Sequence, residues 1–191
     1  MTLPQQMLLL TLLLLALQRL AELWWARRNE RWLRAHGALE FGASHYRFIV
    51  ALHTGFFISL AIEGLARGPQ LHPQWPVILV LLVTTQMARY WCLLALGKFW
   101  NTKILVIPGA GLSRRGPYRW FKHPNYGVVI AEIFLLPFLF QAWWTLLAAS
   151  LLNLLLLRVR IAAEEKALAF AVTKSEHQTS DMQLQTMQAG S

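Results

Sequence analysis

Cysteine and charged residues are scarce in this chain. Its single cysteine, Cys92, lies inside an apolar run, which excludes a disulfide framework or a thiolate metal cluster and leaves helix packing as its predicted role. Charged residues make up 14% of the 191 positions, whereas about a quarter are charged in an average soluble domain. Hydrophobic residues make up 56%. This composition predicts an integral membrane protein.

Acidic residues are especially few, with 9 against 18 basic residues and a formal net charge of +9. Such an excess can indicate a nucleic-acid partner. Here the basic residues gather in the polar segments between long apolar runs, which is where membrane loops carry them. We therefore expect contact with membrane lipids and no nucleic acid. The 6 histidines are scattered, so no metal site is predicted.

Three apolar runs, residues 3–25, 46–66 and 75–96, each match the roughly 20 residues that cross a hydrocarbon core about 30 Å thick. We interpret the first run as a retained helix rather than a cleaved signal peptide. The reason is that Arg19 and Glu22 occupy the place where small cleavage-site residues should lie. The three runs therefore predict three transmembrane helices.

Charged and polar residues inside these spans are expected to have partners, because an unpaired ion is costly in a bilayer. Arg19 and Glu22 are three residues apart, so they can pair on one helix face. Pairing is also predicted for Glu63 and Arg89. His53 is expected to pack and form a hydrogen bond rather than bind a metal.

The apolar run from residue 126 to 157 is too short for two full spans and long for one, and Pro137 interrupts it. Both of its flanks are rich in basic residues, which the positive-inside rule places in the cytoplasm. The run must then enter and leave the membrane from one side. We predict an all-α fold of about five transmembrane helices. The last two form a short hairpin, with the N-terminus outside and the C-terminus in the cytoplasm.

The chain is expected to form a single membrane domain over residues 1–172. From residue 173 onward it is rich in serine, threonine and glutamine and poor in apolar side chains. Such a segment cannot bury enough apolar surface to offset the entropy of ordering, which predicts a disordered polar tail over residues 173–191.

Two polar segments, residues 114–126 and 158–166, are the candidates for a functional site. Pro117 and Pro124 disfavour helix before them, so the first segment is predicted to be a folded cytoplasmic loop. The hairpin would bring this loop beside a C-terminal extension of the last helix. A carboxylate, aromatic faces and a cation could there hold a zwitterionic cofactor with a sulfonium group. The alternative is an aromatic and basic loop that contacts lipid headgroups.

Three motifs stand out in these segments: Gly116-Pro117-Tyr118, then Lys122-His123-Pro124-Asn125-Tyr126, then Arg160-xxx-Glu164-Glu165. Together they resemble the isoprenylcysteine carboxyl methyltransferase family of membrane enzymes. A finer pattern is similar to the bacterial branch of that family, which acts on alkylpyrones and alkylresorcinols. It consists of Phe99-Trp100-Asn101-Thr102-Lys103-Ile104, Pro108-Gly109 and Arg158-Val-Arg160. The resemblance covers about residues 95–170.

The resemblance implies a cofactor and a set of site residues. The cofactor is S-adenosylmethionine, and the residues that would hold it, matched motif by motif, are Tyr118, His123, Pro124, Asn125, Tyr126 and Glu164. Arg160 would face the methyl acceptor as the catalytic residue. Glu165 is the alternative cofactor contact. Lys122 stands where the family usually has arginine, so a bidentate contact is lost there.

The resemblance also implies the reaction, which is methyl transfer to a lipophilic acceptor. The acceptor would be an alkylpyrone- or alkylresorcinol-like compound, or a prenylcysteine-like one. Two alternatives stay open at this point. One is a sterol-reductase-like membrane reductase that uses NADPH, and the other is a non-enzymatic lipid-binding membrane protein. The cofactor that binds would distinguish the three.

Overall fold

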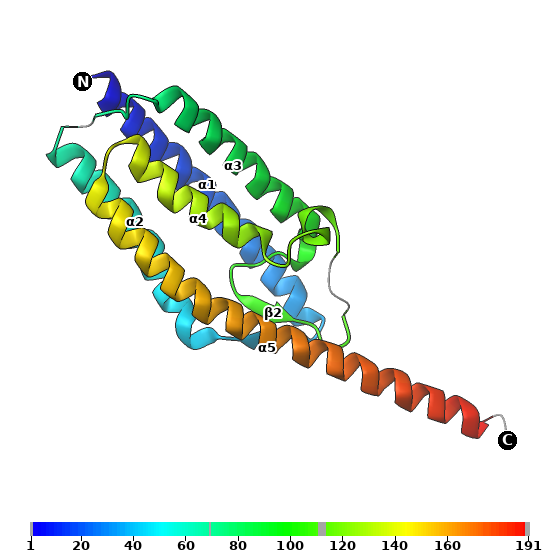
Figure 1. The fold of residues 1–191 in the computed structure, drawn as a ribbon. Helices are drawn as coiled ribbons and strands as arrows, with labels where there is room; N and C mark the ends of the chain where they lie inside the picture. The colour runs from blue at the N-terminus through cyan, green and yellow to red at the C-terminus, as the bar shows by residue number, and fades with distance from the viewer. Residues whose placement is uncertain (1, 69, 111–113, 190–191) are drawn as a thin grey trace.

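The computed structural model describes residues 2–68, 70–110 and 114–189, and most of this chain is helical (Figure 1). The elements in chain order are α1 (Leu3–Ala35), β1 (Leu39–Phe41), α2 (Ala43–Ala66), α3 (Trp75–Leu96), η1 (Gly97–Phe99), β2 (Ile104–Val106), η2 (Gly116–Arg119), α4 (Pro124–Leu139) and α5 (Trp143–Ala189). The helix α1 extends beyond its predicted span, because the tryptophan- and arginine-rich segment after the apolar run continues the helix.

Four of the described helices, α1, α2, α3 and the apolar part of α5, are long and apolar enough to cross a membrane. The helix α4 has 16 residues. At 1.5 Å per residue it is about 24 Å long, less than a hydrocarbon core of roughly 30 Å. A tight turn, in which Gln141 has a left-handed φ of 52°, leads from α4 into α5. The predicted all-helical membrane fold with a short final hairpin is confirmed.

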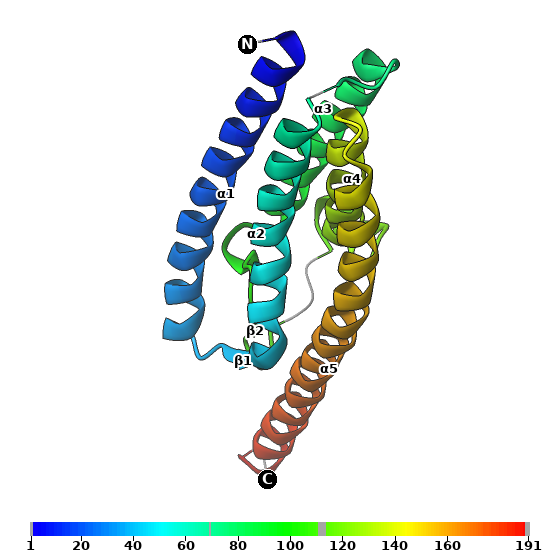
Figure 2. The same cartoon turned by 90° about the vertical axis from the view of Figure 1, so that its left-hand side faces the viewer.

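Successive helices run in opposite directions, so the N-terminus and the α4–α5 turn lie at one end of the bundle (Figures 1 and 2). The other end, called the loop end below, carries β1, β2, η2 and the start of α4. The two strands pair antiparallel, with Leu39 opposite Val106 and Phe41 opposite Ile104. They join the α1–α2 connection to the segment after α3. Strands of three residues leave no periodic signal, and this pair was not predicted.

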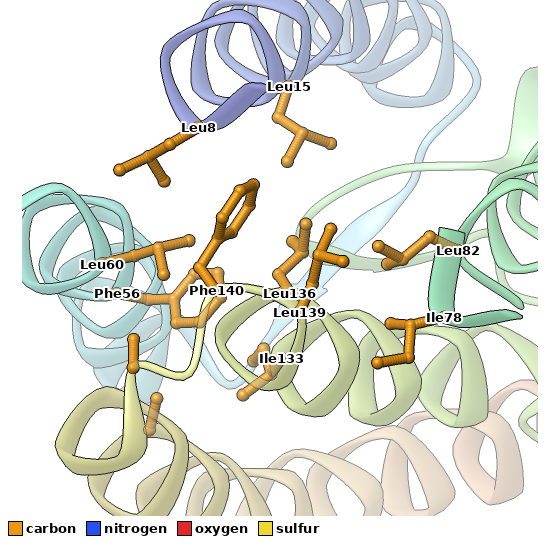
Figure 3. Packing of buried hydrophobic residues seen from close by; sticks show 12 residues of the cluster. Leu8, Leu15, Phe56, Leu60, Ile78, Leu82, Ile133, Leu136, Leu139 and Phe140 are labelled. Atoms are coloured by element: carbon orange, nitrogen blue, oxygen red, sulfur yellow. The ribbon is translucent and has the colours of Figure 1, made fainter. Parts of the chain in front are cut away.

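The main apolar core lies between α1, α2, α3, α4 and the first turns of α5 (Figure 3). Its residues come from the half of the bundle farther from the loop end. Leu8 of α1 and Leu60 of α2 are fully buried in it. Gly64 allows α1 and α2 to approach, because a Cβ atom there would lie 2.6 Å from Leu8 Cδ2. Outward-facing apolar side chains stay exposed, as expected for a lipid-facing surface; examples are Leu13, Ile62, Val80 and Leu151.

A buried group of four charged residues, called the ionic cluster below, joins α1, α3 and α4. Arg19 and Glu22 pair at 2.7 Å, as predicted from their spacing. Arg89 donates from Nε and Nη2 to the two oxygens of Glu22, both at 2.6 Å. Glu132 of α4 accepts from Arg19 at 2.7 Å and from Arg89 at 3.1 Å. The predicted pairing of Arg89 is confirmed, and the cluster is formally neutral.

Glu63 and His53 also have the partners that were predicted for them. The Glu63 carboxylate pairs with Arg67 at 3.2 Å and accepts hydrogen bonds from the backbone N–H and the hydroxyl of Thr145, each at 2.8 Å. These bonds satisfy backbone groups at the start of α5, so a residue of α2 caps another helix. The Nδ1 atom of His53 lies 2.8 Å from the carbonyl oxygen of Ile49.

The helix α5 continues well past its apolar segment and projects from the loop end, away from the other helices (Figure 1). An isolated polar helix is marginal in water. The helical backbone up to Ala189 is therefore compatible with a tail that is disordered in solution. The division into a domain over residues 1–172 and a disordered tail over residues 173–191 stays a prediction.

Candidate functional site

A cavity of about 580 Å³ opens at the loop end, between β2, the segment around η2, the start of α4 and the middle of α5. Its wall includes every predicted site residue except Pro124. The rest of the wall is formed mainly by the segment from residue 95 to 110 and by Leu168 and Ala171 of α5. The fold therefore brings the two polar segments of the sequence to one cavity.

Pro124 is the first residue of α4, and His123 precedes it with an extended φ of −133°. Proline suits this position, because its fixed φ matches the helix and its missing N–H would have no intrahelical partner there. Pro124 therefore starts α4, and the position of this helix start places His123, Asn125 and Tyr126 at the cavity. A direct contact between Pro124 and a cofactor stays a prediction.

The Tyr126 hydroxyl connects the two predicted site residues of α5, Arg160 and Glu164. It donates a short hydrogen bond to Glu164 Oε2 and accepts one of 2.9 Å from Arg160 Nε. Arg160 also donates from Nη2 to the carbonyl oxygen of Thr102 at 2.8 Å. Arg160 and Glu164 are one helical turn apart, yet no ion pair of 4 Å or less joins them in the described structure. Tyr126 lies between them instead.

The rings of His123 and Tyr126 are stacked, with centroids 5.3 Å apart and planes at 17°. Two buried polar atoms at the start of α4, His123 Nε2 and Asn125 Oδ1, make no hydrogen bond within the described residues, although His123 Nε2 lies 3.8 Å from Glu165 Oε1. A buried polar atom without a partner costs about 1–3 kcal/mol. Both residues line the cavity, so a ligand with a complementary donor or acceptor can supply the missing bond.

Tyr118 enters the cavity wall from η2 and packs against the small apolar cluster that contains Cys92 and Trp100. Burial raises the pKa of the Tyr118 phenol, with a further contribution from nearby Glu164. The hydroxyl therefore stays protonated at neutral pH and can act as a hydrogen-bond donor, not as a base. Cys92 itself is buried, which agrees with the packing role predicted for it.

The two adjacent glutamates of α5 have different surroundings. Glu164 lines the cavity and is held by Tyr126. Glu165 is exposed and pairs with Lys122 at 2.6 Å. Of the two candidates for the cofactor contact, the geometry favours Glu164. Lys122 therefore both pairs with Glu165 and lines the cavity.

The wall on the α3 side depends in part on Asn29, which no sequence motif indicated. Asn29 of α1 donates to the carbonyl oxygens of Gly97 and Trp100, at 3.0 and 2.7 Å. Asn101 donates in turn to the carbonyl oxygen of Ala26 at 2.9 Å. These bonds fasten the segment after α3 to α1. Asn29 lies among tryptophans and arginines of an interfacial sequence, where one buried amide leaves no periodic signal.

Basic side chains predominate in the described lining of the cavity. The lining contains one carboxylate, Glu164, and five basic residues: Lys103, Arg114, Arg115, Lys122 and Arg160. Glu30 and Glu165, outside the lining, pair with Lys103 and Lys122. A concave site with an excess of one charge sign attracts ligands of the opposite sign. This cavity therefore favours a ligand that carries an anionic group.

The profile of the isoprenylcysteine carboxyl methyltransferase (ICMT) family matches residues 77–170, from α3 into α5. The chain is 49% identical over 159 residues to "Uncharacterized protein YpbQ" of Bacillus subtilis, a match that covers 83% of this chain and 95% of that protein. It is 28% identical over 149 residues to an uncharacterized protein of Haemophilus influenzae, over 78% of this chain and 87% of that protein. No solved structure matches the chain. The matched region contains every predicted site residue, and the chain belongs to the isoprenylcysteine carboxyl methyltransferase family of membrane methyltransferases.

Proposed function

We propose that this protein is an S-adenosylmethionine-dependent methyltransferase that methylates an ionised oxygen of a lipophilic acceptor. The observation that carries the proposal is one cavity lined by Glu164, Arg160, His123 and Asn125, in which Asn125 Oδ1 makes no hydrogen bond to the described residues. Membership of a methyltransferase family supports the type of reaction. The positive lining of the cavity supports an acceptor that is anionic when it reacts.

The residues of the cavity suit this cofactor. Glu164 offers a carboxylate to the ribose hydroxyls or to the ammonium group, and Asn125 Oδ1 is a second acceptor without a partner in the described structure. The stacked faces of His123 and Tyr126 can attract a sulfonium by cation–π interaction, worth about 0.5–2 kcal/mol. Tyr118 adds a hydroxyl donor. When bound there, the cofactor supplies an electrophilic methyl group.

Arg160 is the residue that we assign to the acceptor. Two of its nitrogens are fixed by Tyr126 and by the carbonyl oxygen of Thr102. Its Nη1 atom makes no hydrogen bond within the described part of the chain, so it can contact an acceptor oxyanion in the cavity. A fixed cation at that position favours the anionic form of a phenol, an enol or a carboxylic acid, so the acceptor releases its proton to solvent before the methyl group is transferred. No strong general base is then required.

The acceptor is proposed to enter from the bilayer with its apolar tail between the helices, and the cofactor to enter from the cytoplasm. The loop end carries both the cavity and most of the basic residues, which supports a cytoplasmic loop end and C-terminus in a bacterial inner membrane. Candidate acceptors are alkylpyrones, alkylresorcinols and prenylcysteines, because each combines an acidic oxygen with a long apolar chain.

Binding and transfer can be measured on the protein purified in detergent. We expect S-adenosylhomocysteine, but not NADPH, to raise the melting temperature. We also expect a labelled methyl group to pass from S-adenosylmethionine to one member of an alkylpyrone, alkylresorcinol and prenylcysteine panel. Stabilisation by NADPH alone would replace the proposal with a reductase. Binding of neither cofactor would favour a lipid-binding protein.

The adjacent glutamates provide a matched pair of variants for the cofactor site. Glu164→Gln removes the carboxylate that lines the cavity, and Glu165→Gln removes the exposed one beside it. A hydrogen bond to a charged group is worth about 1.5–3 kcal/mol, so Glu164→Gln should weaken S-adenosylhomocysteine binding by about 10- to 100-fold in calorimetry. Glu165→Gln should leave the affinity within about threefold. Equal effects would remove Glu164 from the cofactor site.

A further inference from the structure

The Tyr126 hydroxyl stands at the centre of a continuous chain of hydrogen bonds. This chain runs from the carbonyl oxygen of Thr102 through Arg160 and Tyr126 to Glu164. Its two ends have different tasks in the function proposed above, since Glu164 is assigned to the cofactor and Arg160 to the acceptor. The same oxygen atom donates to Glu164 and accepts from Arg160, so neither bond can change without affecting the other.

The geometry excludes a simpler link between the two residues. An arginine and a glutamate four residues apart on a helix often pair directly. Here the described structure holds no such ion pair, because the Arg160 guanidinium extends towards Thr102 and lies 5.7 Å from the centre of the Tyr126 ring. The only hydrogen bonds that connect Arg160 with Glu164 in the described residues pass through the Tyr126 oxygen.

We propose that Tyr126 is a positioning residue whose hydroxyl couples the cofactor contact at Glu164 to the acceptor contact at Arg160. This inference rests on the proposed function. When a ligand group binds to the Glu164 carboxylate, the hydrogen bond from the Tyr126 hydroxyl to that carboxylate weakens. The hydrogen bond from Arg160 Nε to the Tyr126 oxygen then changes in strength as well. Consecutive hydrogen bonds polarise one another in a site of low dielectric constant. Cofactor binding would thereby set the direction in which Arg160 Nη1 points.

The hydroxyl and the ring of Tyr126 have separable tasks. The ring stacks on His123 and would remain in Tyr126→Phe, whereas both hydrogen bonds of the chain would be lost. Tyr118→Phe is the matched control. It also removes one hydroxyl from the cavity wall, but that hydroxyl has no hydrogen bond to Arg160 or Glu164 in the described structure.

The test is a double-mutant cycle between Arg160→Gln and Glu164→Gln, measured with the intact tyrosine and again in the Tyr126→Phe protein. The readouts are S-adenosylhomocysteine affinity and melting temperature in the same detergent. Substitutions of two residues in one hydrogen-bond network are typically non-additive by about 2- to 150-fold. We expect the two substitutions to be non-additive by at least about fivefold with the tyrosine present, and additive within about twofold in Tyr126→Phe. The Tyr118→Phe background should keep the full coupling.

A kinetic measurement separates positioning from a purely structural role. With the acceptor that gives labelled product, Tyr126→Phe should lower kcat by about 10-fold or more while the KM for S-adenosylmethionine moves by less than about threefold. A structural defect would instead lower the melting temperature and the cofactor affinity together.

Three results would overturn the coupling. The first is that Arg160→Gln and Glu164→Gln are equally non-additive with and without the Tyr126 hydroxyl. The second is that they are additive in the protein that retains this hydroxyl, and the third is that their coupling is lost in the Tyr118→Phe control. If the protein bound no S-adenosylhomocysteine, the proposed function would fail. The melting-temperature cycle, which needs no ligand, would still decide whether Tyr126 links Arg160 to Glu164.

Discussion

Glu132→Gln should destabilise the protein more than any exposed substitution of the same kind. The Glu132 carboxylate is 4% exposed and accepts three hydrogen bonds inside the bundle. The donors are Arg19 and Gln86, each at 2.7 Å, and Arg89 at 3.1 Å. Glutamine keeps the shape of the side chain but offers one acceptor oxygen. It would also leave two arginines beside a single remaining carboxylate, that of Glu22.

The size of the effect follows from the charge that becomes uncompensated. Breaking a buried ion pair by removal of one partner costs about 3–5 kcal/mol. Interhelical hydrogen bonds in membrane proteins average about 0.6 kcal/mol each, which sets a lower bound near 2 kcal/mol for three bonds. We therefore expect the free energy of unfolding to fall by about 2–5 kcal/mol.

Unfolding by sodium dodecyl sulfate in detergent micelles, followed by circular dichroism, measures this change. Glu165→Gln is the control, because its exposed pair with Lys122 should contribute less than about 1 kcal/mol. A second variant that carries both Glu132→Gln and Arg19→Gln is formally neutral again and should recover part of the loss. A change below about 1 kcal/mol for Glu132→Gln, or no recovery in the double variant, would refute the view that the ionic cluster holds α1, α3 and α4 together.

Two further predictions concern topology and the acceptor. Single cysteines placed at positions 115 and 175 of a Cys92→Ser protein should be labelled by an impermeant reagent from the same, cytoplasmic side of oriented membranes; labelling from opposite sides would contradict the hairpin. Arg160→Lys keeps a positive charge but loses the planar fork of donors. Misplacement of a reacting group by about 1 Å can cost about 10²-fold in rate. Turnover should therefore fall by about that factor while S-adenosylhomocysteine affinity changes by less than about fivefold, and full activity would remove Arg160 from the acceptor site.

The membrane fold could be predicted because it depends on one quantity, the length of the apolar runs relative to a bilayer. A short final hairpin also followed from length, since residues 126–157 cannot form two full spans; which of its two helices is short, α4, did not follow. Proline and basic flanks then required a hairpin. The strands β1 and β2 could not be predicted, because six residues that pair across a sequence separation of more than 60 leave no local pattern.

The partners of the buried charges show where sequence reasoning ends. The pair of Arg19 and Glu22 lies within one helix, so its spacing predicted it. The contacts from Arg89 to Glu22 and Glu132 depend on how α1, α3 and α4 are rotated about their axes, which no local pattern specifies. The sequence likewise predicted that Glu63 has a partner. It could not predict that Glu63 caps the first turn of another helix, because that contact also depends on how the helices pack.

For the candidate site, too, the sequence predicted which residues take part but not how they are arranged. The motifs supplied the residues of the cavity, because each motif is a continuous stretch of sequence that can be matched by itself. Tyr126 was matched only as a cofactor contact, and its hydrogen bonds to Arg160 and Glu164 depend on the angle at which α5 passes the start of α4. The helical spacing of Arg160 and Glu164 even suggests a direct pair, which the described structure does not contain. A residue from another helix occupies the space between them, and only a tertiary structure can show that Arg160 and Glu164 both form a hydrogen bond with the same oxygen atom.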